Sequence, residues 1–188
     1  MSGSFGELSV PPTLIAFAVT TDSTKNIISP EFKKQGSNVF LADTPLDKND
    51  LPDFEKLKEI YAYVRKLVLE GKVLAAKTVS HGGIASAIAK MSFGNKIGFS
   101  FEDGYSLDEM FKKKTASIIL ELDIDEDVDI PEILRPLGVT LREDGLSWCG
   151  QTVSISELAE EWQNTLKSVF PLKLDSEGEI STLTSEVR

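Results

Sequence analysis

Apolar residues along the chain follow two patterns: short runs bounded by turn-forming residues, and longer segments with an apolar residue every three to four positions. Short apolar runs that are rich in β-branched residues are typical of buried strands. These runs predict strands at residues 13–20, 37–42, 72–79, 97–101 and 115–122.

The longer segments predict helices. The clearest is residues 50–69, where apolar side chains recur at helical spacing and Gly71 marks the end. Ser106 and Glu109 stand three residues apart and form a capping box, which predicts the start of a short helix. Further helices are expected at residues 84–91, at residues 130–137 before Gly138, and at residues 156–170 with Ser156 as the cap.

The last third of the chain carries turn signals and acidic residues. Residues 143–145, Glu-Asp-Gly, separate the apolar segments 139–142 and 146–155, and this predicts a β-hairpin. The acidic run 123–129 is interpreted as a solvated loop, because it lacks the glycine and the ligand spacing of a calcium-binding loop. Residues 175–188 are polar and without periodicity, which predicts a linker or a frayed end.

Helices and strands are thus mixed along the chain, with a hairpin among longer crossover connections. This order predicts an α+β fold, a layered α/β sandwich around a mixed sheet. Hydrophobic residues make up 41% of the chain and charged residues 27%, which is ordinary for a globular protein.

The formal charge of −10 at pH 7 argues against a nucleic acid or an anionic membrane surface as a partner. Both would require clustered Lys and Arg side chains. A single cysteine, Cys149, cannot form an internal disulfide, and a cytoplasmic location is expected. The sequence around Cys149 predicts a small buried residue within a strand, and Trp148 and Trp162 are expected in the core.

The segment with the strongest chemical signal is residues 77–85, where a predicted strand ends, a Gly82-Gly83 turn follows and a helix begins. N–H groups at a helix start attract anions, and glycine lets a phosphate approach the backbone. Ser80 and His81 would lie at the mouth of this turn. A purely structural glycine turn remains an alternative. His81 is either a surface or capping residue, a ligand contact or an acid–base group. No second histidine is present to share a zinc site.

Residues 77–99, from Lys-Thr-Val-Ser-His-Gly-Gly to Gly-Phe, resemble a signature in the second half of large, single-chain phosphoribosylformylglycinamidine synthases. Two other stretches resemble the same family and occur in the same order: residues 1–19 resemble the end of a preceding domain, and residues 28–36 resemble the join into the C-terminal domain. The resemblance implies that Met1 is an internal methionine of a longer chain.

The resemblance implies a fold like the C-terminal domain of aminoimidazole ribonucleotide synthetase. It also implies a division of the chain into three parts. These are the end of a preceding domain at residues 1–28, an α/β domain at residues 29–172, and an acidic linker or tail at residues 173–188.

The function implied by the resemblance is that of a ligase in de novo purine biosynthesis. The whole enzyme uses ATP and Mg²⁺ to activate the amide of formylglycinamide ribonucleotide, and ammonia from glutamine gives the amidine. Ser80, His81, Gly82 and Gly83 would line a cleft for a phosphate or nucleotide. Related members have Asp where this chain has His81, so we expect a supporting contact and assign no catalytic residue and no metal ligand.

The partners implied by the resemblance are the remaining synthetase domains, a glutaminase domain and a ribonucleotide phosphate. Two other functions remain open at this point. One is a different ATP-using member of the superfamily, such as selenophosphate synthetase or thiamine-phosphate kinase, and the other is a non-catalytic binding or assembly module.

The chain by itself is expected to bind no cofactor tightly, to hydrolyse no glutamine and to turn over no ATP, because no nucleophile motif and no nucleotide loop are present. The strand expected at residues 13–19 should either add to the sheet of this domain or mediate association, which includes a homodimer of the chain.

Overall fold

The computed structural model describes residues 3–124 and 130–169. Within these ranges seven strands form one sheet, in which every neighbouring pair is antiparallel except β5 and β8, which are parallel. The expected mixed sheet is therefore confirmed. In spatial order the strands are β4 (Val73–Thr78), β6 (Ile118–Leu122), β3 (Asn38–Ala42), β7 (Leu134–Leu141), β5 (Gly98–Phe101), β8 (Leu146–Trp148) and β9 (Gln151–Val153).

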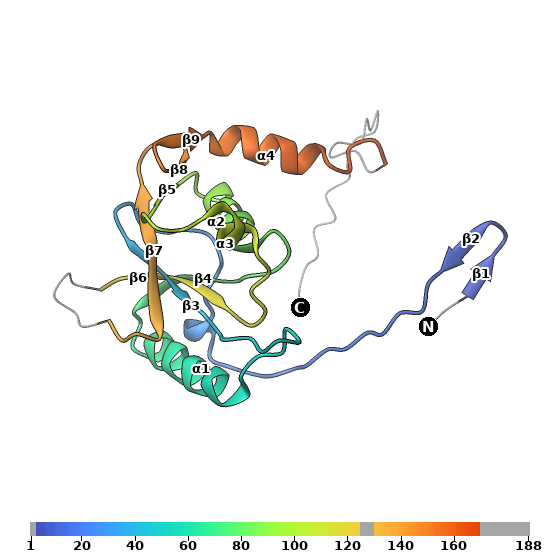
Figure 1. Cartoon of the computed structure of the whole chain (residues 1–188), viewed down its shortest axis with the longest axis horizontal. Coiled ribbons are helices and arrows are strands. Elements are labelled where there is room, and N and C mark those ends of the chain that lie inside the picture. The colour runs from blue at the N-terminus through green and yellow to red at the C-terminus, as the bar shows by residue number, and fades with distance from the viewer. Residues whose placement is uncertain (1–2, 125–129, 170–188) are drawn as a thin grey trace, which may run out of the picture.

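Helices cover both faces of the sheet, which makes the fold a layered sandwich (Figure 1). Helix α1 (Phe54–Leu69) packs on one face, and α2 (Gly83–Phe93) and the short α3 (Leu107–Phe111) pack on the other. Helix α4 (Ile155–Asn164) lies against α2. A single 3₁₀ turn, Thr24–Asn26, precedes the sheet.

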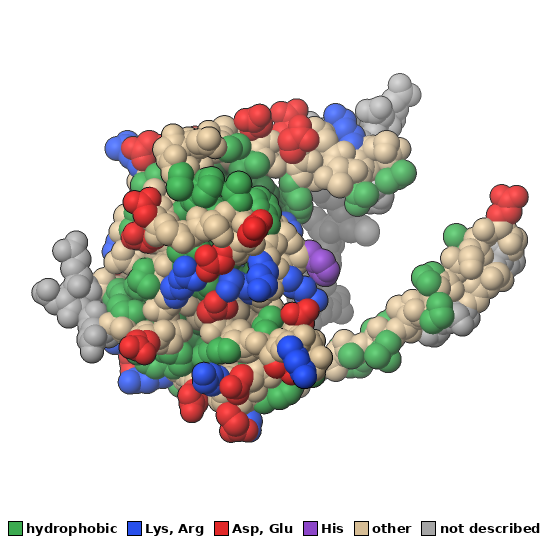
Figure 2. Space-filling view, in the orientation of Figure 1, with side chains coloured by type: hydrophobic (Ala, Val, Ile, Leu, Met, Phe, Trp, Pro, Cys, Tyr) green, Lys and Arg blue, Asp and Glu red, His purple; other side chains and the backbone are tan. Residues whose placement is uncertain are grey.

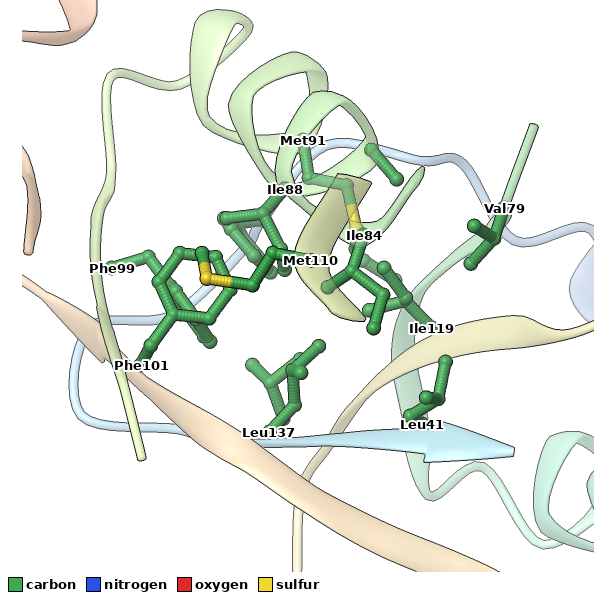
Figure 3. Close-up of a cluster of buried hydrophobic side chains, with 14 of the residues drawn as sticks. Leu41, Val79, Ile84, Ile88, Met91, Phe99, Phe101, Met110, Ile119 and Leu137 are labelled. Atoms are coloured by element: carbon green, nitrogen blue, oxygen red, sulfur yellow. The ribbon is translucent and has the colours of Figure 1, made fainter. Parts of the chain in front are cut away.

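The alternation of side chains along β3 builds two hydrophobic clusters at once. Val39 and Leu41 belong to the cluster under α2, whereas Phe40 and Ala42 belong to the cluster under α1. Successive residues of a strand point to opposite faces, so a run that is apolar throughout must be covered on both sides. Figure 3 shows the first cluster, in which Ile84 and Ile88 of α2 face the sheet residues Leu41 and Leu137.

Short polar side chains begin the helices, as capping rules predict. The Asp53 carboxylate accepts from the N–H groups of Glu55 and Lys56, and the Ser106 hydroxyl accepts from the N–H of Glu109. The cap of α4 is Ser154, not Ser156 as expected, because the Ser154 hydroxyl accepts from the N–H of Ser156 at 3.1 Å. The helix expected through residue 170 ends at Asn164, and residues 165–169 form turns, while residue 170 lies outside the described residues.

The helix expected at residues 130–137 is wrong, because residues 134–141 form the long strand β7. Leu134 and Leu137 are buried in the two hydrophobic clusters on opposite faces of the sheet. In a short apolar run, the spacing of apolar residues alone does not tell a buried strand from a buried helix. Proline inside a central strand is unusual. In β7 this proline is Pro136, and a shift in the pairing with β3 accommodates it. Val39 pairs with Gly138, whereas the next residue, Phe40, pairs with Pro136.

The hairpin expected between residues 139–142 and 146–155 is also wrong. Strand β5 lies between β7 and β8, and the true hairpin is β8–β9. Its two turn residues, Cys149 and Gly150, both have positive φ, at 46° and 75°, as a tight two-residue turn requires. Cys149 is exposed and is not the buried strand residue that was expected. Trp162, expected in the core, is 56% exposed, whereas Trp148 is partly buried.

The apolar run at residues 13–20 forms no strand, so the prediction that it adds a strand to the sheet is wrong. It forms an extended segment that joins the domain to the small hairpin of β1 (Gly3–Phe5) and β2 (Leu8–Val10), as the blue end of the ribbon shows (Figure 1). Leu14 is 95% exposed and Phe17 is 87% exposed. No described strand pairs with this run.

Among the described residues, one carboxylate is buried, and it lies on β6, the second strand from one edge of the sheet. Glu121 on β6 is 0% exposed. Its two oxygens accept from the backbone N–H groups of Lys33 at 2.8 Å and Lys34 at 2.9 Å, and from the Ser37 hydroxyl at 2.9 Å. These donors satisfy a charge that would otherwise be costly to bury.

In the part of the chain that the structure describes, no helix has both the length and the apolar character needed to cross a membrane.

We predict that Glu121→Ala lowers the free energy of unfolding by about 3 kcal/mol or more, because it leaves the backbone N–H groups of Lys33 and Lys34 without acceptors and removes one of the two acceptors of the Ser37 hydroxyl. Glu121→Gln should have a smaller effect, since one oxygen remains. Urea unfolding followed by circular dichroism measures both. Glu59→Ala, a change at an exposed glutamate of α1, should stay within about 0.5 kcal/mol. An equal effect of Glu121→Ala and Glu59→Ala would contradict the assigned role of the buried carboxylate.

Candidate functional site

The Ser80–Gly83 turn connects β4 to α2 at one edge of the sheet. The Gly83 N–H donates to the Ser80 carbonyl at 3.1 Å, and the Ser86 N–H donates to the Gly82 carbonyl at 3.2 Å. Gly82 and Gly83 have φ of 84° and 64°, which L-residues with side chains adopt only with strain. The structure thus brings the four expected site residues together at the start of α2.

Three of the four residues are open to ligands. Ser80, His81 and Gly82 are exposed, whereas Gly83 is buried. His81 forms no hydrogen bond or ion pair with any described residue. A free imidazole and a hydroxyl beside a helix start can contact an anion, and the helix dipole favours negative charge there.

Gly83 also has a structural role that does not depend on any ligand. A Cβ atom added at Gly83 would lie 2.4 Å from the carbonyl oxygen of Met110 and 2.8 Å from that of Lys112. The start of α2 therefore lies directly against the end of α3. This contact fixes the position of the segment that follows α3.

That segment, Lys112–Lys114, was not selected as a site from the sequence, although the run of three lysines is visible there. Its position beside the glycine turn depends on the packing of α3 on α2. Lys114 forms an ion pair with Asp43, whose carboxylate also accepts from the Ser117 hydroxyl at 3.0 Å. Figure 2 shows Lys and Arg side chains interspersed with Asp and Glu side chains across the middle of the molecule, with the purple histidine close by.

A second group of polar side chains consists of Tyr105, Glu109 and Arg135. The Arg135 guanidinium lies 4.1 Å from the centre of the Tyr105 ring and forms an ion pair with Glu109. The hydrogen bond that Arg135 donates to Glu109 holds the pKa of the Glu109 carboxyl below its ordinary value. The Tyr105 hydroxyl donates to the Pro136 carbonyl at 2.8 Å, and burial raises the pKa of Tyr105 to about 12.

Three hollows surround these elements. A pocket of about 170 Å³ is lined by residues 43–46 and 112–114. A neighbouring hollow of about 470 Å³ is bordered by charged side chains that include Asp43 and Arg135. An apolar groove of about 350 Å³ lies between α2, α3, α4 and the β8–β9 hairpin. Among the described residues, no three His, Cys, Asp or Glu side chains are grouped so that they could hold a metal ion.

Residues 31–146, more than half of the chain, match the family described as AIR synthase related protein, C-terminal domain. The chain belongs to this family. The AIR synthase-like fold expected from the resemblance is thereby confirmed, and the match covers β3 to β7 with the turn and the lysine run between them.

The chain is also similar in sequence to individual curated proteins, which are named as one enzyme subunit. The chain is 31% identical over 131 residues to the phosphoribosylformylglycinamidine synthase subunit PurL of Thermoplasma volcanium, a match that covers 60% of this chain and 17% of the relative. It is 27% identical over 179 residues to the same subunit of Picrophilus torridus, which covers 84% of this chain and 24% of the relative. The chain thus spans about a quarter or less of the length of these relatives. The resemblance to phosphoribosylformylglycinamidine synthases is confirmed, with relatives that are named as PurL subunits.

Solved structures share the fold. PurL of Thermotoga maritima complexed with ADP superposes with a TM-score of 0.59 at 15% identity, over 72% of this chain and 27% of that chain. PurL of Thermotoga maritima complexed with ATP gives a TM-score of 0.57 at 16% identity, over 72% and 28%.

We predict that Gly83→Ala lowers the free energy of unfolding by more than about 3 kcal/mol, since a strained φ is combined with a backbone clash. Gly104→Ala is the matched control. Gly104 has φ of 98°, and an added Cβ would meet nothing within 4 Å, so the expected loss is only about 1–2 kcal/mol. Urea unfolding of both variants tests the contact between α2 and α3, and equal losses would argue against it.

We also predict that the domain loses stability in alkaline solution through Tyr105. Its folded-state pKa of about 12 lies above the ordinary 10.0, so the neutral phenol stabilises the folded state below pH 10. This contribution, about 3 kcal/mol, is lost as the pH rises from 10 towards 12. Unfolding measured between pH 9 and pH 12 should show a shallower decline in Tyr105→Phe than in the wild type. Parallel curves would show that Tyr105 is not the group responsible.

Proposed function

We propose that this chain is part of phosphoribosylformylglycinamidine synthase and contributes one wall of a nucleotide or phosphate cleft in that enzyme. The observation that carries the proposal is the family match together with the similarity to PurL subunits. Solved structures of Thermotoga maritima PurL are described as complexes with ATP and with FGAR, which supports a cleft of this kind.

The whole enzyme would convert formylglycinamide ribonucleotide to the amidine, with ATP consumed and glutamine as the source of ammonia. Mg²⁺ would neutralise phosphate charge in that reaction, and we assign no residue of this chain to it. The glutaminase and the remaining synthetase domains would be partners, which the structure described as PurLQS from Thermotoga maritima supports. A cytoplasmic location and the domain division at residues 28 and 172 belong to the same proposal.

The residues of this chain would bind and orient ligand without transferring protons. Gly82 lets an anion approach the backbone at the start of α2, and the exposed Ser80 and His81 side chains are placed to donate hydrogen bonds to it. His81 has no carboxylate or other described partner to orient it as a general base. We therefore keep it as a ligand contact and assign no catalytic residue.

Another ATP-using enzyme of the superfamily is the weaker candidate. The curated relatives reported above are all PurL subunits, and no observation on this chain favours a selenophosphate synthetase or a thiamine-phosphate kinase.

Calorimetric titration of the purified chain with ADP–Mg²⁺ and with formylglycinamide ribonucleotide tests the proposal. We expect Ser80→Ala and His81→Ala each to weaken binding several-fold, as the loss of a hydrogen bond to a charged group does. Both side chains are exposed, so the fold should persist. Ser9→Ala, in the N-terminal hairpin, is the control.

Glutamine hydrolysis and ATP turnover by the same samples should stay at background. Substantial turnover by the chain alone, or binding that neither the serine nor the histidine variant changes, would contradict the role given to the turn.

A further inference from the structure

The pocket of about 170 Å³ between residues 43–46 and 112–114 has a composition that the proposed function does not explain. It is lined by three lysines, and Asp43 is the single carboxylate among its lining residues. The chain as a whole carries a formal charge of −10. The grouping of three lysines at one pocket of an acidic protein therefore suggests a separate role for this pocket.

The three lysines differ in their pairing. Lys114 is largely buried, with 14% of its side chain exposed, and forms an ion pair with Asp43. Lys112 and Lys113 are exposed and form no ion pair with any described residue. Asp108 lies one helical turn before Lys112, yet it forms no ion pair within the described ranges. Within residues 3–124 and 130–169, no carboxylate pairs with the ammonium groups of Lys112 and Lys113 at the pocket.

The packing of the protein holds these two lysines in place. The backbone of residues 110–112 lies against Gly83, and the Lys112 N–H donates to the Asp108 carbonyl at 3.0 Å. On the other side of the pocket, the Thr44 N–H donates to the Ser117 hydroxyl at 3.0 Å. Both ammonium groups belong to side chains that line the same pocket, and a bound anion would attract each of them.

We propose that Lys112 and Lys113 form a binding subsite for a phosphate monoester dianion in this pocket. Lysine binds phosphate as a point charge, and a phosphate monoester carries about −1.5 to −2 charges at pH 7, which matches two unpaired ammonium groups. The volume is below the roughly 300–1,000 Å³ of pockets for whole drug-sized ligands. The pocket therefore takes a phosphate group, while the rest of the ligand lies outside it.

This subsite does not require the Ser80–Gly83 turn to bind anything, so the two can fail separately. The test is calorimetric titration of the full chain with inorganic phosphate and with ribose 5-phosphate at constant ionic strength. Lys112→Ala combined with Lys113→Ala should weaken both affinities tenfold or more. Lys112→Arg combined with Lys113→Arg should retain binding, because the charge is kept.

A charge-matched control is the pair Lys25→Ala and Lys90→Ala. Lys25 lies in the 3₁₀ turn before the sheet, and Lys90 lies in the last turn of α2, at the opposite end of that helix from the pocket. This pair removes the same charge and should leave the affinity for phosphate nearly unchanged. Circular dichroism of each variant serves as the check that it is folded.

Three results would overturn the subsite. The first is the absence of saturable binding of either probe to the wild type, and the second is an equal loss in the control pair, which would mean non-specific charge attraction. The third is a loss of phosphate binding in Ser80→Ala and His81→Ala but not in the double lysine variant. That result would place the anion at the glycine turn, so the lysine subsite would fail while the proposed function stood.

Discussion

The buried carboxylate of Glu121 is the interaction on which the arrangement of this domain depends. It is 0% exposed on β6, and it accepts from the backbone of Lys33 and Lys34 and from Ser37. A buried ion without partners would cost several kcal/mol, so the chain entering the domain must adopt the one path that supplies these donors. Thr140 on β7 completes the arrangement, because its hydroxyl donates to the Lys34 carbonyl at 2.7 Å and accepts from the Ser37 N–H at 2.8 Å.

This polar junction joins β6, β7 and the loop before β3, so it ties together three neighbouring strands of the sheet, β6, β3 and β7. Their registers in turn place the C-terminal ends of β3 and β4 at the edge where β6 and β7 begin. The parts of the candidate site lie next to these strand ends: Asp43 follows β3, the Ser80–Gly83 turn follows β4, and Lys112–Lys114 precede β6. The candidate site is therefore a consequence of strand register, and its residues are far apart in the sequence.

The glycine turn has a structural and a chemical role at the same positions. Gly83 is required because the backbone at the end of α3 occupies the space of a side chain. The same close contact brings the lysine run beside the start of α2. A structural interpretation of the Gly-Gly pair and a ligand-binding one are thus compatible, since the packing that excludes a Cβ atom also gathers the groups that can hold an anion.

The sequence by itself determined the features that depend on neighbouring residues. The alternation in β3, the caps at Asp53 and Ser106, the glycine turn before α2 and the family resemblance could all be read from local patterns. Only the tertiary structure decided which strand pairs with which. The spacing of apolar residues indicates that a segment is buried, but it does not indicate which segment packs beside it. For this reason β7 was predicted to be a helix, and the hairpin was predicted between β7 and β8 when it is formed by β8 and β9. The apolar run at residues 13–20 was likewise predicted to be a strand. The donors to Glu121 and the lysine pocket were likewise hidden, because each is assembled by contacts between residues that are distant along the chain.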